Sequence, residues 1–277
     1  MASSPLQDPS PQLTFQQLRT QYLAAYDQQL RLDAEVTGAL AVTRIGPLLL
    51  ATFDGGRGFI TYADLAGADQ AAIAAWVQQA DMSFRAAPEV TAVEWKSRAH
   101  DAAPGLHQAL SRSGFQQGEP ESIMIGAAAG LVADTSLPAG ITVRRITDPA
   151  EVRAVSAMQD TVFGEAVSVS RAQDLVNKLQ RDDGTQLWAA EHAGQFVSAG
   201  RLEPVAGTDF AGIWGGATLP EWRHQGIYRT LTAERARAAL QLGKTLIHSD
   251  STEFSRPILE RAGLLKVSST TPYTWTR

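Results

Sequence analysis

The chain contains no cysteine among its 277 residues. This absence excludes disulfide bonds, cysteine nucleophiles, iron–sulfur clusters and zinc sites with thiolate ligands. A basic excess is missing as well, because 24 Lys and Arg residues stand against 29 Asp and Glu residues and give a formal net charge of −5. Proteins that bind nucleic acid usually gather Lys and Arg on one face, so we expect no nucleic-acid partner.

Long apolar segments are also absent. The longest charge-free apolar run, Ile123 to Ala133, has about half of the roughly 20 residues that a membrane span requires. Residues Met1 to Thr14 contain neither Lys nor Arg and no apolar core, which does not fit a secretory signal. We therefore expect a cytoplasmic protein without a membrane partner. The chain has five histidines: His100, His107, His192, His224 and His248. Their spacing matches no metal-binding motif, so we expect no metal site.

Composition divides the chain into two parts. Residues 1–12 are rich in Ser, Pro and Gln and are predicted to be a disordered lead-in. Asp, Thr, Ser, Pro and Gly gather at 134–140 between two apolar segments, which is typical of a linker. The predicted domains are therefore 13–133 and 141–277, each long enough to form its own core.

Strand-like and helix-like segments alternate in both parts, which predicts an α/β (α+β) layered fold. The predicted strands are 42–53, 59–62, 90–95, 141–146, 187–191, 196–202, 210–218 and 245–248. The predicted helices are 15–26, 68–80, 104–113, one opened by Asp148 and Pro149, 172–180, 226–242 and 255–262.

The two parts also share a residue pattern at an offset of 149. Asp101, Leu110, Arg112 and Gly114 recur as Asp250, Leu259, Arg261 and Gly263. The pattern favours an internal duplication. The alternative is that glycine often ends a helix, whatever its origin.

The most informative segment runs from Phe210 to Gly243. A predicted strand leads through a short loop into a long helix whose apolar stripe begins at Ile227. Unpaired amides and the helix dipole at such a junction favour an anion, usually a phosphate. Gly226 would let the backbone approach that phosphate, and Arg223 and Arg229 add positive charge. The spacing matches neither the P-loop nor the dinucleotide-binding fingerprint.

This segment resembles the acetyl-CoA loop of the GNAT superfamily of N-acetyltransferases. The resemblance rests on Arg223-x-x-Gly226-x-Tyr228, the preceding Leu219-Pro220-Glu221-Trp222 and the downstream stretch 255–264. It covers 140–277 and implies a sheet in which two strands part to admit acetyl-CoA as co-substrate. The cofactor-binding residues that it implies are Ala217, Thr218, Leu219, Arg223, His224, Gln225, Gly226, Ile227, Tyr228, Arg229, Ser251 and Ser255.

Together with the duplication, the resemblance implies two tandem GNAT-like domains, each a mixed, mostly antiparallel sheet flanked by helices. The first is expected to be degenerate. Displacing the loop by 149 residues lands on Ala74 to Val77, inside a predicted helix and without a glycine or a basic residue. One cofactor per chain is therefore expected, and a fragment starting near Gly140 is expected to keep the binding.

Candidate catalytic residues are less well defined. Glu203 and Asp209 flank a predicted hairpin and could take a proton from an amine, although a solvated hairpin would look the same. The tyrosine that protonates the leaving thiolate in many family members is replaced here by Leu259, which leaves Tyr228 and Tyr273 as substitutes. A backbone N–H of Ala217 or Thr218 is expected to stabilise the oxyanion.

The resulting hypothesis is an N-acetyltransferase that transfers the acetyl group of acetyl-CoA to the primary amine of a small molecule by direct attack, without a covalent enzyme intermediate. The alternatives are a protein acetyltransferase, acting on Lys or an N-terminus, and a non-catalytic acyl-CoA-binding module. Gly226→Val is expected to weaken cofactor binding while changing stability little, because Val is tolerated in a first helical turn. The sequence leaves the oligomeric state open.

Overall fold

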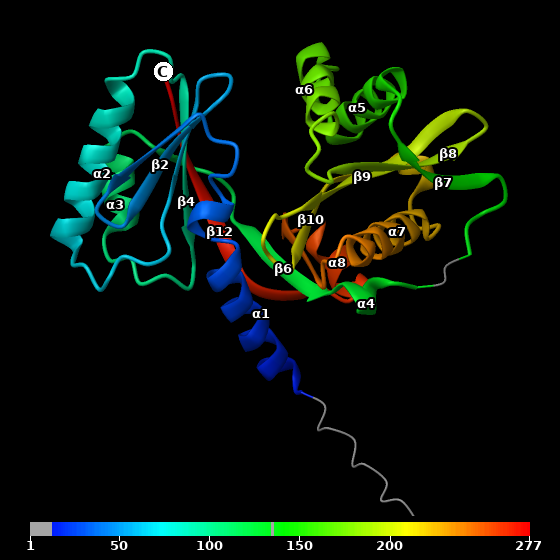
Figure 1. Ribbon diagram of the computed structural model, residues 1–277, viewed down its shortest axis with the longest axis horizontal. Helices are drawn as coiled ribbons and strands as arrows, with labels where there is room; N and C mark the ends of the chain where they lie inside the picture. Colours follow the sequence, from blue (N-terminus) through cyan, green and yellow to red (C-terminus); the bar gives the residue numbers. More distant parts are fainter. Residues whose placement is uncertain (1–12, 134–135) are drawn as a thin grey trace, which may run out of the picture.

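The computed structural model describes residues 13–133 and 136–277. Figure 1 shows two halves, each with helices against strands, joined across the middle by long strands. The predicted lead-in at 1–12 and residues 134–135 of the predicted linker lie outside the described residues.

The N-terminal half follows the predicted alternation of strands and helices. Its elements are α1 (Phe15–Gln29), the 3-10 helix η1 (Leu32–Ala34), β1 (Ala41–Ile45), β2 (Leu48–Phe53), β3 (Arg57–Thr61), α2 (Gln70–Arg85), β4 (Ala92–Arg98), α3 (Leu106–Arg112), β5 (Gln116–Gln117), β6 (Glu121–Ala127) and α4 (Ala128–Leu131).

The C-terminal half begins with a strand and two helices and then repeats the order of strands and α-helices from β1 to α3, followed by a last strand. Its elements are β7 (Ile141–Ile146), α5 (Pro149–Phe163), α6 (Val169–Leu179), β8 (Gln186–His192), β9 (Gln195–Pro204), β10 (Phe210–Thr218), the 3-10 helix η2 (Pro220–Trp222), α7 (Ile227–Gln241), β11 (Leu246–Ser251), α8 (Arg256–Ala262) and β12 (Leu265–Thr276). As predicted, Asp148 opens α5 by accepting from the N–H groups of Ala150 and Glu151, and Pro149 occupies the first turn.

The strands form one continuous mixed sheet within the described residues. Its order is β1-β2-β3-β4-β12-β6-β11-β10-β9-β8-β7, with β5 paired to β12. Only β3 with β4 and β10 with β11 run parallel there, one pair in each half. The predicted mixed, mostly antiparallel α/β fold is confirmed, but the two expected sheets are joined into one.

The join is an exchange of last strands. β6 of the N-terminal half pairs with β11, in the register Ser122↔Ser251, and β12 of the C-terminal half pairs with β4, in the register Tyr273↔Trp95. β6 and β12 also pair with each other. Deleting residues 13–133 would therefore remove β6 and expose an edge of β11. We expect a fragment starting at Gly140 to fold poorly, contrary to the expectation from the sequence.

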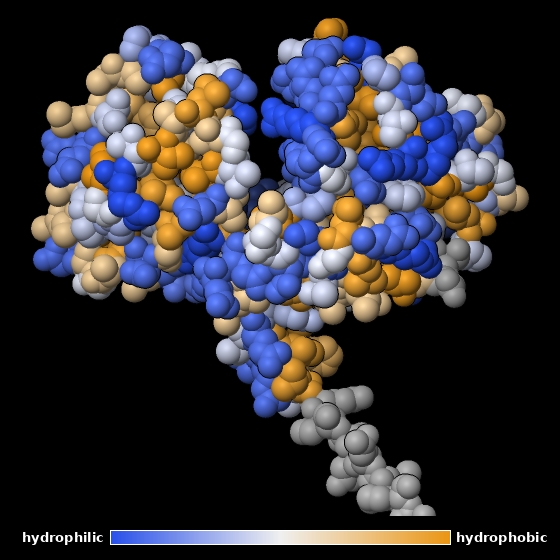
Figure 2. Space-filling view, viewed as in Figure 1, coloured by the Kyte–Doolittle hydropathy of each residue, from blue (hydrophilic) through white to orange (hydrophobic). Residues whose placement is uncertain are grey.

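Helices cover both faces of the sheet. On one face α2 and α3 pack against the N-terminal strands, and α7 and α8 pack against the C-terminal strands. On the other face α1 covers β6 and β10, and α5 and α6 cover β8 and β9. Figure 2 shows the surface hollowed between the two halves, with hydrophilic residues bordering the hollow. Among the described residues, no helix is long and apolar enough to cross a membrane.

Candidate functional site

The parallel strands β10 and β11 part soon after they meet. They pair at three positions, the last being Gly212↔His248, although β10 continues to Thr218 and β11 to Ser251. Beyond the last pair, the register between β10 and β9 shifts between Trp214 and Ala217. This bulge bends β10, so its outer backbone edge no longer faces a strand. We call the opening between β10 and β11 the splay.

The backbone at the end of β10 is oriented toward the splay. Leu219 N–H donates to the carbonyl oxygen of Val197 on β9 at 2.9 Å. Because successive amides of a strand point to opposite sides, the Thr218 N–H faces away from β9, toward the splay. The Thr218 carbonyl accepts a bond from Nε of Arg223 at 3.1 Å. Of the two backbone N–H groups expected to stabilise an oxyanion, that of Thr218 faces the splay, and its role stays a prediction.

The loop after β10 ends at an uncapped helix. Gly226 is the N-cap of α7, with φ of +80°, and no side chain caps the first amides. His224 also has a positive φ of 62°. A Cβ built on Gly226 meets no protein atom within 4 Å. The glycine is therefore required by its backbone angle and not by crowding within the protein.

Tyr228 places its hydroxyl group against the bulge. A Cβ built on Gly216 would lie 2.5 Å from the Tyr228 oxygen. The buried guanidinium group of Arg235 lies 5.5 Å from the centre of the Tyr228 ring on the other side. The phenol is thus held against the bulge, beside the splay.

Serine hydroxyls line the same side of the splay. Ser249 Oγ donates to the Ile213 carbonyl at 2.9 Å, which bridges the two strands where they part. Ser251 Oγ is buried without a hydrogen-bond partner in the described part of the chain, and so is Ser122 Oγ on the neighbouring strand. Ser255, in contrast, uses its hydroxyl group locally, 3.1 Å from Thr252 Oγ1.

Comparison with known proteins identifies the arrangement. No family model and no curated protein matches the sequence. Among solved structures, a GCN5-related N-acetyltransferase from Kribbella flavida is similar, with a TM-score of 0.63, 16% identity and coverage of 93% of each chain. A tandem GNAT protein from the clavulanic acid biosynthesis pathway has a TM-score of 0.62 and 15% identity, covering 93% of this chain and 95% of the other. The chain has the tandem GNAT fold.

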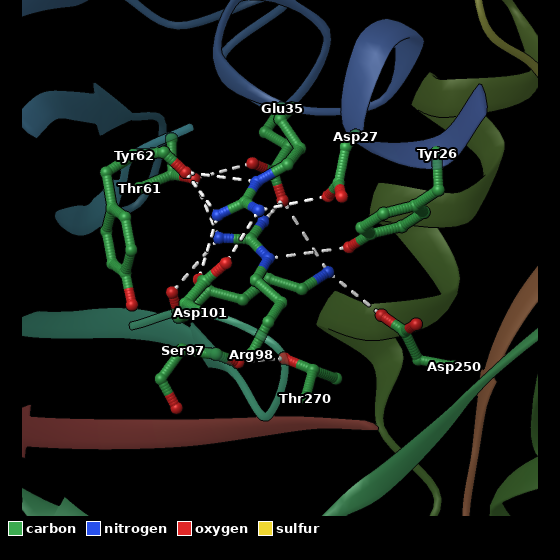
Figure 3. A network of polar contacts seen from close by, with 12 residues as sticks. Tyr26, Asp27, Glu35, Thr61, Tyr62, Ser97, Arg98, Asp101, Asp250 and Thr270 are labelled. Carbon is green, nitrogen blue, oxygen red and sulfur yellow. Dashed lines mark hydrogen bonds and ion pairs between the residues drawn. The ribbon is translucent and has the colours of Figure 1, made fainter. Parts of the chain in front are cut away.

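Within the tandem GNAT fold, the N-terminal half has closed the position that corresponds to the splay. β3 and β4 stay paired through Ile60↔Trp95, one residue before β3 ends. Arg98 of β4 then donates to Thr61 at 3.2 Å and forms an ion pair with Glu35. Figure 3 shows this buried network.

The loop between β3 and α2 is also unsuited to phosphate. Asp69 caps α2 by accepting from Ala72 N–H at 2.9 Å, and Asp64 accepts from Ala66 N–H at 2.6 Å. Two carboxylates therefore occupy amides that a phosphate would use, and their charge would repel it. This loop, and not Ala74 to Val77, corresponds to the loop before α7, because α2 and α7 are offset by 157 residues whereas α3 and α8 are offset by 150.

The face of the sheet that carries α1, α5 and α6 presents charged groups to the splay. Glu203 on β9 lies 2.6 Å from Lys178 Nζ and 2.9 Å from Arg201 Nε. Burial alone would raise the pKa of Glu203, but these two cations outweigh it and hold the pKa below its usual range. A carboxylate held in this way is a weak base, so its geometry favours a structural role over proton abstraction.

Two other predicted catalytic residues lie away from the splay. Asp209 precedes β10 at its far end and accepts from Gln29 Nε2 at 3.0 Å. Tyr273 lies in the core of the N-terminal half, with its hydroxyl group 3.3 Å from His107 Nδ1. The structure brings Ala217, Thr218, Tyr228 and Ser251 together at the splay and leaves these two apart. In the described ranges, no group of three or more His, Asp or Glu residues could hold a metal ion.

The sequence reasoning missed the groups that come from the exchanged strands. Lys96 of β4 reaches across the join and lies 2.9 Å from Asp250 Oδ2. Burial would raise the pKa of Asp250, but Lys96 outweighs it and lowers that pKa. Glu94 and Glu121 lie on the same face, and burial raises the pKa of both. One feature of the sequence could have pointed to Glu94: it is a charged residue between Val93 and Trp95, so in a strand its side chain lies on the face opposite theirs.

Proposed function

We propose that the chain is an acetyl-CoA-dependent N-acetyltransferase that acts on the primary amine of a small molecule, with its co-substrate held by the C-terminal half. The observation that carries the proposal is the uncapped N-terminus of α7 directly beside the open edge of β10. A helix N-terminus with free amides binds phosphate well, and a strand edge with free amides can bind an extended chain containing amide groups. Coenzyme A has both groups next to each other: a pyrophosphate, which suits the helix N-terminus, followed by a pantetheine arm with amide groups, which suits the strand edge.

The residues present fit that ligand. The backbone from Arg223 to Tyr228 would hold the pyrophosphate, with Arg229 nearby, and the space beside Gly226 is free of protein atoms. The edge from Ala217 to Leu219 would hold the pantetheine arm. The buried Ser251 hydroxyl, which has no partner in the described chain, supplies a polar contact on the same face.

The two faces of the sheet separate the two substrates. The loop and Ser251 lie on the face covered by α7 and α8, whereas Glu121 and Asp250 lie on the opposite face. An amine would therefore meet the thioester at the splay. Acetyl-CoA supplies an activated acetyl group with a thiolate as leaving group, so the amine can attack directly. Thr218 N–H is oriented to stabilise negative charge on the carbonyl oxygen, and the Tyr228 hydroxyl can give a proton to the thiolate.

The test is acetyl-CoA-dependent thiol release in the presence of amines. Because the protein has no cysteine, a thiol reagent reports only the coenzyme A that is released. We expect release with at least one small primary amine. Binding of acetyl-CoA without release in any amine or peptide mixture would contradict the enzyme assignment and favour a binding module. Release with peptides alone would favour a protein acetyltransferase.

Tyr228→Phe separates the proton donor from the binding site. It removes only the hydroxyl group, so we expect kcat to fall by roughly 10²-fold while acetyl-CoA binding is kept. Tyr273→Phe is the matched control, because its hydroxyl group lies in the other core. Equal effects of the two substitutions would contradict the role given to Tyr228.

A further inference from the structure

One face of the sheet carries acidic groups from both halves. Ile123 and Ile125 of β6 pack under α1, so by alternation Glu121 is on the same face. His248 of β11 packs edge-on against Phe210 of that same cluster, which places His248 and Asp250 on this face too. Asp250 is paired in register with Ile123, two residues from Glu121, so the two carboxylates are diagonal neighbours across the β6–β11 join.

The charges on this face do not balance. Arg98 is paired with Glu35, Lys96 with Asp250, and Lys178 and Arg201 with Glu203. Glu94 and Glu121 have no hydrogen bond or ion pair among the described residues. The nearby Lys96 acts on both carboxylates, but it is already paired with Asp250 and Glu35, so Glu94 and Glu121 have no cation of their own on a partly buried surface. Such groups are costly unless a positive charge joins them.

A second observation points to a ligand on the same face of the sheet. His248 is 9% exposed, and its Nε2 is buried without a hydrogen-bond partner in the described part of the chain. Oδ1 of Asp250 is likewise buried and unpartnered, although Oδ2 is bonded to Lys96. Two buried polar atoms on this face of the sheet therefore have unused hydrogen-bonding capacity. Native proteins rarely leave such atoms unsatisfied.

We propose that these groups form a cation subsite and that the acceptor is a primary amine carrying a second positive charge, as in an aliphatic diamine, with Glu121 as the residue that selects it. The inference rests on the proposed function for the reaction, but the binding of the cation does not depend on turnover. Glu121 belongs to the N-terminal half, so the exchanged strand β6 completes the acceptor site of the C-terminal half.

The second charge follows from the chemistry of the reaction. The attacking nitrogen must lose its proton, after which it no longer gains from a carboxylate. An alkyl ammonium has a pKa near 10.4, so a second amine elsewhere in the molecule stays charged at neutral pH. That charge keeps its attraction to Glu121 and Asp250 while the first nitrogen reacts. The His248 nitrogen can add a neutral hydrogen bond.

The experiment compares 1,4-diaminobutane with n-butylamine, which has the same carbon chain but one amine. Calorimetry measures binding to the full-length protein, and thiol release measures turnover. We expect the diamine to bind more tightly and to have a lower KM. Glu121→Gln should raise the Kd and KM of the diamine about 10- to 100-fold, because a charge-assisted hydrogen bond is lost. The KM of acetyl-CoA should not change.

The matched control is Glu119→Gln, which removes the same charge two residues away on an exposed loop. It should leave the diamine Kd unchanged. Glu121 has no partner to lose, so Glu121→Gln should fold normally, and an unchanged melting temperature verifies this. Three results would overturn the cation subsite. They are equal binding of diamine and monoamine, equal effects of Glu121→Gln and Glu119→Gln on diamine binding, and no binding of either amine. Diamine binding that depends on Glu121 without acetyl transfer would support the subsite and contradict the proposed function alone.

Discussion

Replacing Gly226 by alanine tests whether the loop before α7 binds the pyrophosphate. Gly226 has φ of +80°, and a Cβ there meets no protein atom within 4 Å. The substitution therefore costs backbone strain of about 1–2 kcal/mol, without a clash inside the protein. For a chain of this size, we expect the melting temperature of the free protein to fall by roughly 2–6 °C. The sequence-based expectation that Gly226→Val leaves stability nearly unchanged is wrong, because Gly226 is an N-cap with positive φ and not a residue of the first helical turn.

Binding should fall as well, for a different reason. The Cβ would occupy space that the phosphate needs for contact with the amides. Acetyl-CoA at about 100 times its Kd stabilises the parent by roughly 2.7 kcal/mol, and tenfold weaker binding would reduce this to about 1.4 kcal/mol. The thermal shift caused by acetyl-CoA should therefore be about halved or less. A thermal scan with and without acetyl-CoA measures both effects on one sample.

Gly194→Ala is the matched control. Gly194 has φ of +82° in the β8–β9 turn, also with nothing within 4 Å of its Cβ. Gly194→Ala should lower the melting temperature of the free protein as much as Gly226→Ala, because the backbone strain is the same. The increase in melting temperature caused by acetyl-CoA should remain that of the parent. If the two variants show equal shifts, the loop does not hold the pyrophosphate, and the main support for the acetyltransferase proposal is lost.

Three further predictions concern the rest of the molecule. Titration with a coenzyme A analogue should saturate at one per chain by calorimetry, because Asp69 occupies the helix amides of the N-terminal half; two per chain would contradict this. Asp101→Ala should destabilise the protein by about 2–3 kcal/mol in denaturant unfolding, because the buried Arg31 guanidinium group loses a bidentate partner and keeps only the partly exposed Asp27 and the Tyr62 carbonyl. A loss below about 1 kcal/mol would contradict a buried pair. Burial lowers the pKa of His248 to about 4 in the folded protein. Between about pH 6.5 and pH 4, the imidazole is therefore protonated in the unfolded chain but not in the folded one, so the free energy of unfolding declines as the pH falls through this range. Replacing His248 by Gln should remove about 2 kcal/mol of the stability difference between pH 7 and pH 5, and an unchanged pH slope would refute the shift.

Local signals in the sequence predicted most single elements well. The strand 210–218 and the helix opened by Asp148 agree with the structure, because alternation and capping are properties of short segments. Strand β12 was not predicted at all. Its run from Leu265 to Thr276 is rich in Ser and Thr, and its partners on β4 and β6 are more than a hundred residues away along the chain. Without that strand, the exchange could not be anticipated.

The predicted cofactor loop comes from one stretch of sequence, whereas the proposed acceptor face combines stretches that are far apart in the sequence. The residues from Arg223 to Arg229 are contiguous, so the strand-to-helix junction, its glycine and its two arginines predicted an anion-binding loop, and the resemblance to GNAT proteins extended the prediction to Ala217. Glu121 and Asp250 come together only through the exchange, so no spacing rule could pair them. Tyr273 was a reasonable candidate by residue type, but β12 carries it into the N-terminal core. The offset of 149 failed for the loop because the connections within the two halves differ in length.

The exchange of last strands also affects how the chain can fold during its synthesis. β4 receives its second neighbour only when Leu265–Thr276 has been made, and β6 receives its neighbours only when Leu246–Ser251 and Leu265–Thr276 have been made. Until then the half made first presents an unpaired strand edge, with hydrogen-bonding groups open to other nascent chains. Such late, non-local pairing raises the contact order and slows folding. Neither half can therefore close until the ribosome has released Leu265–Thr276, and exposure of the chain to chaperones should be greatest before that point.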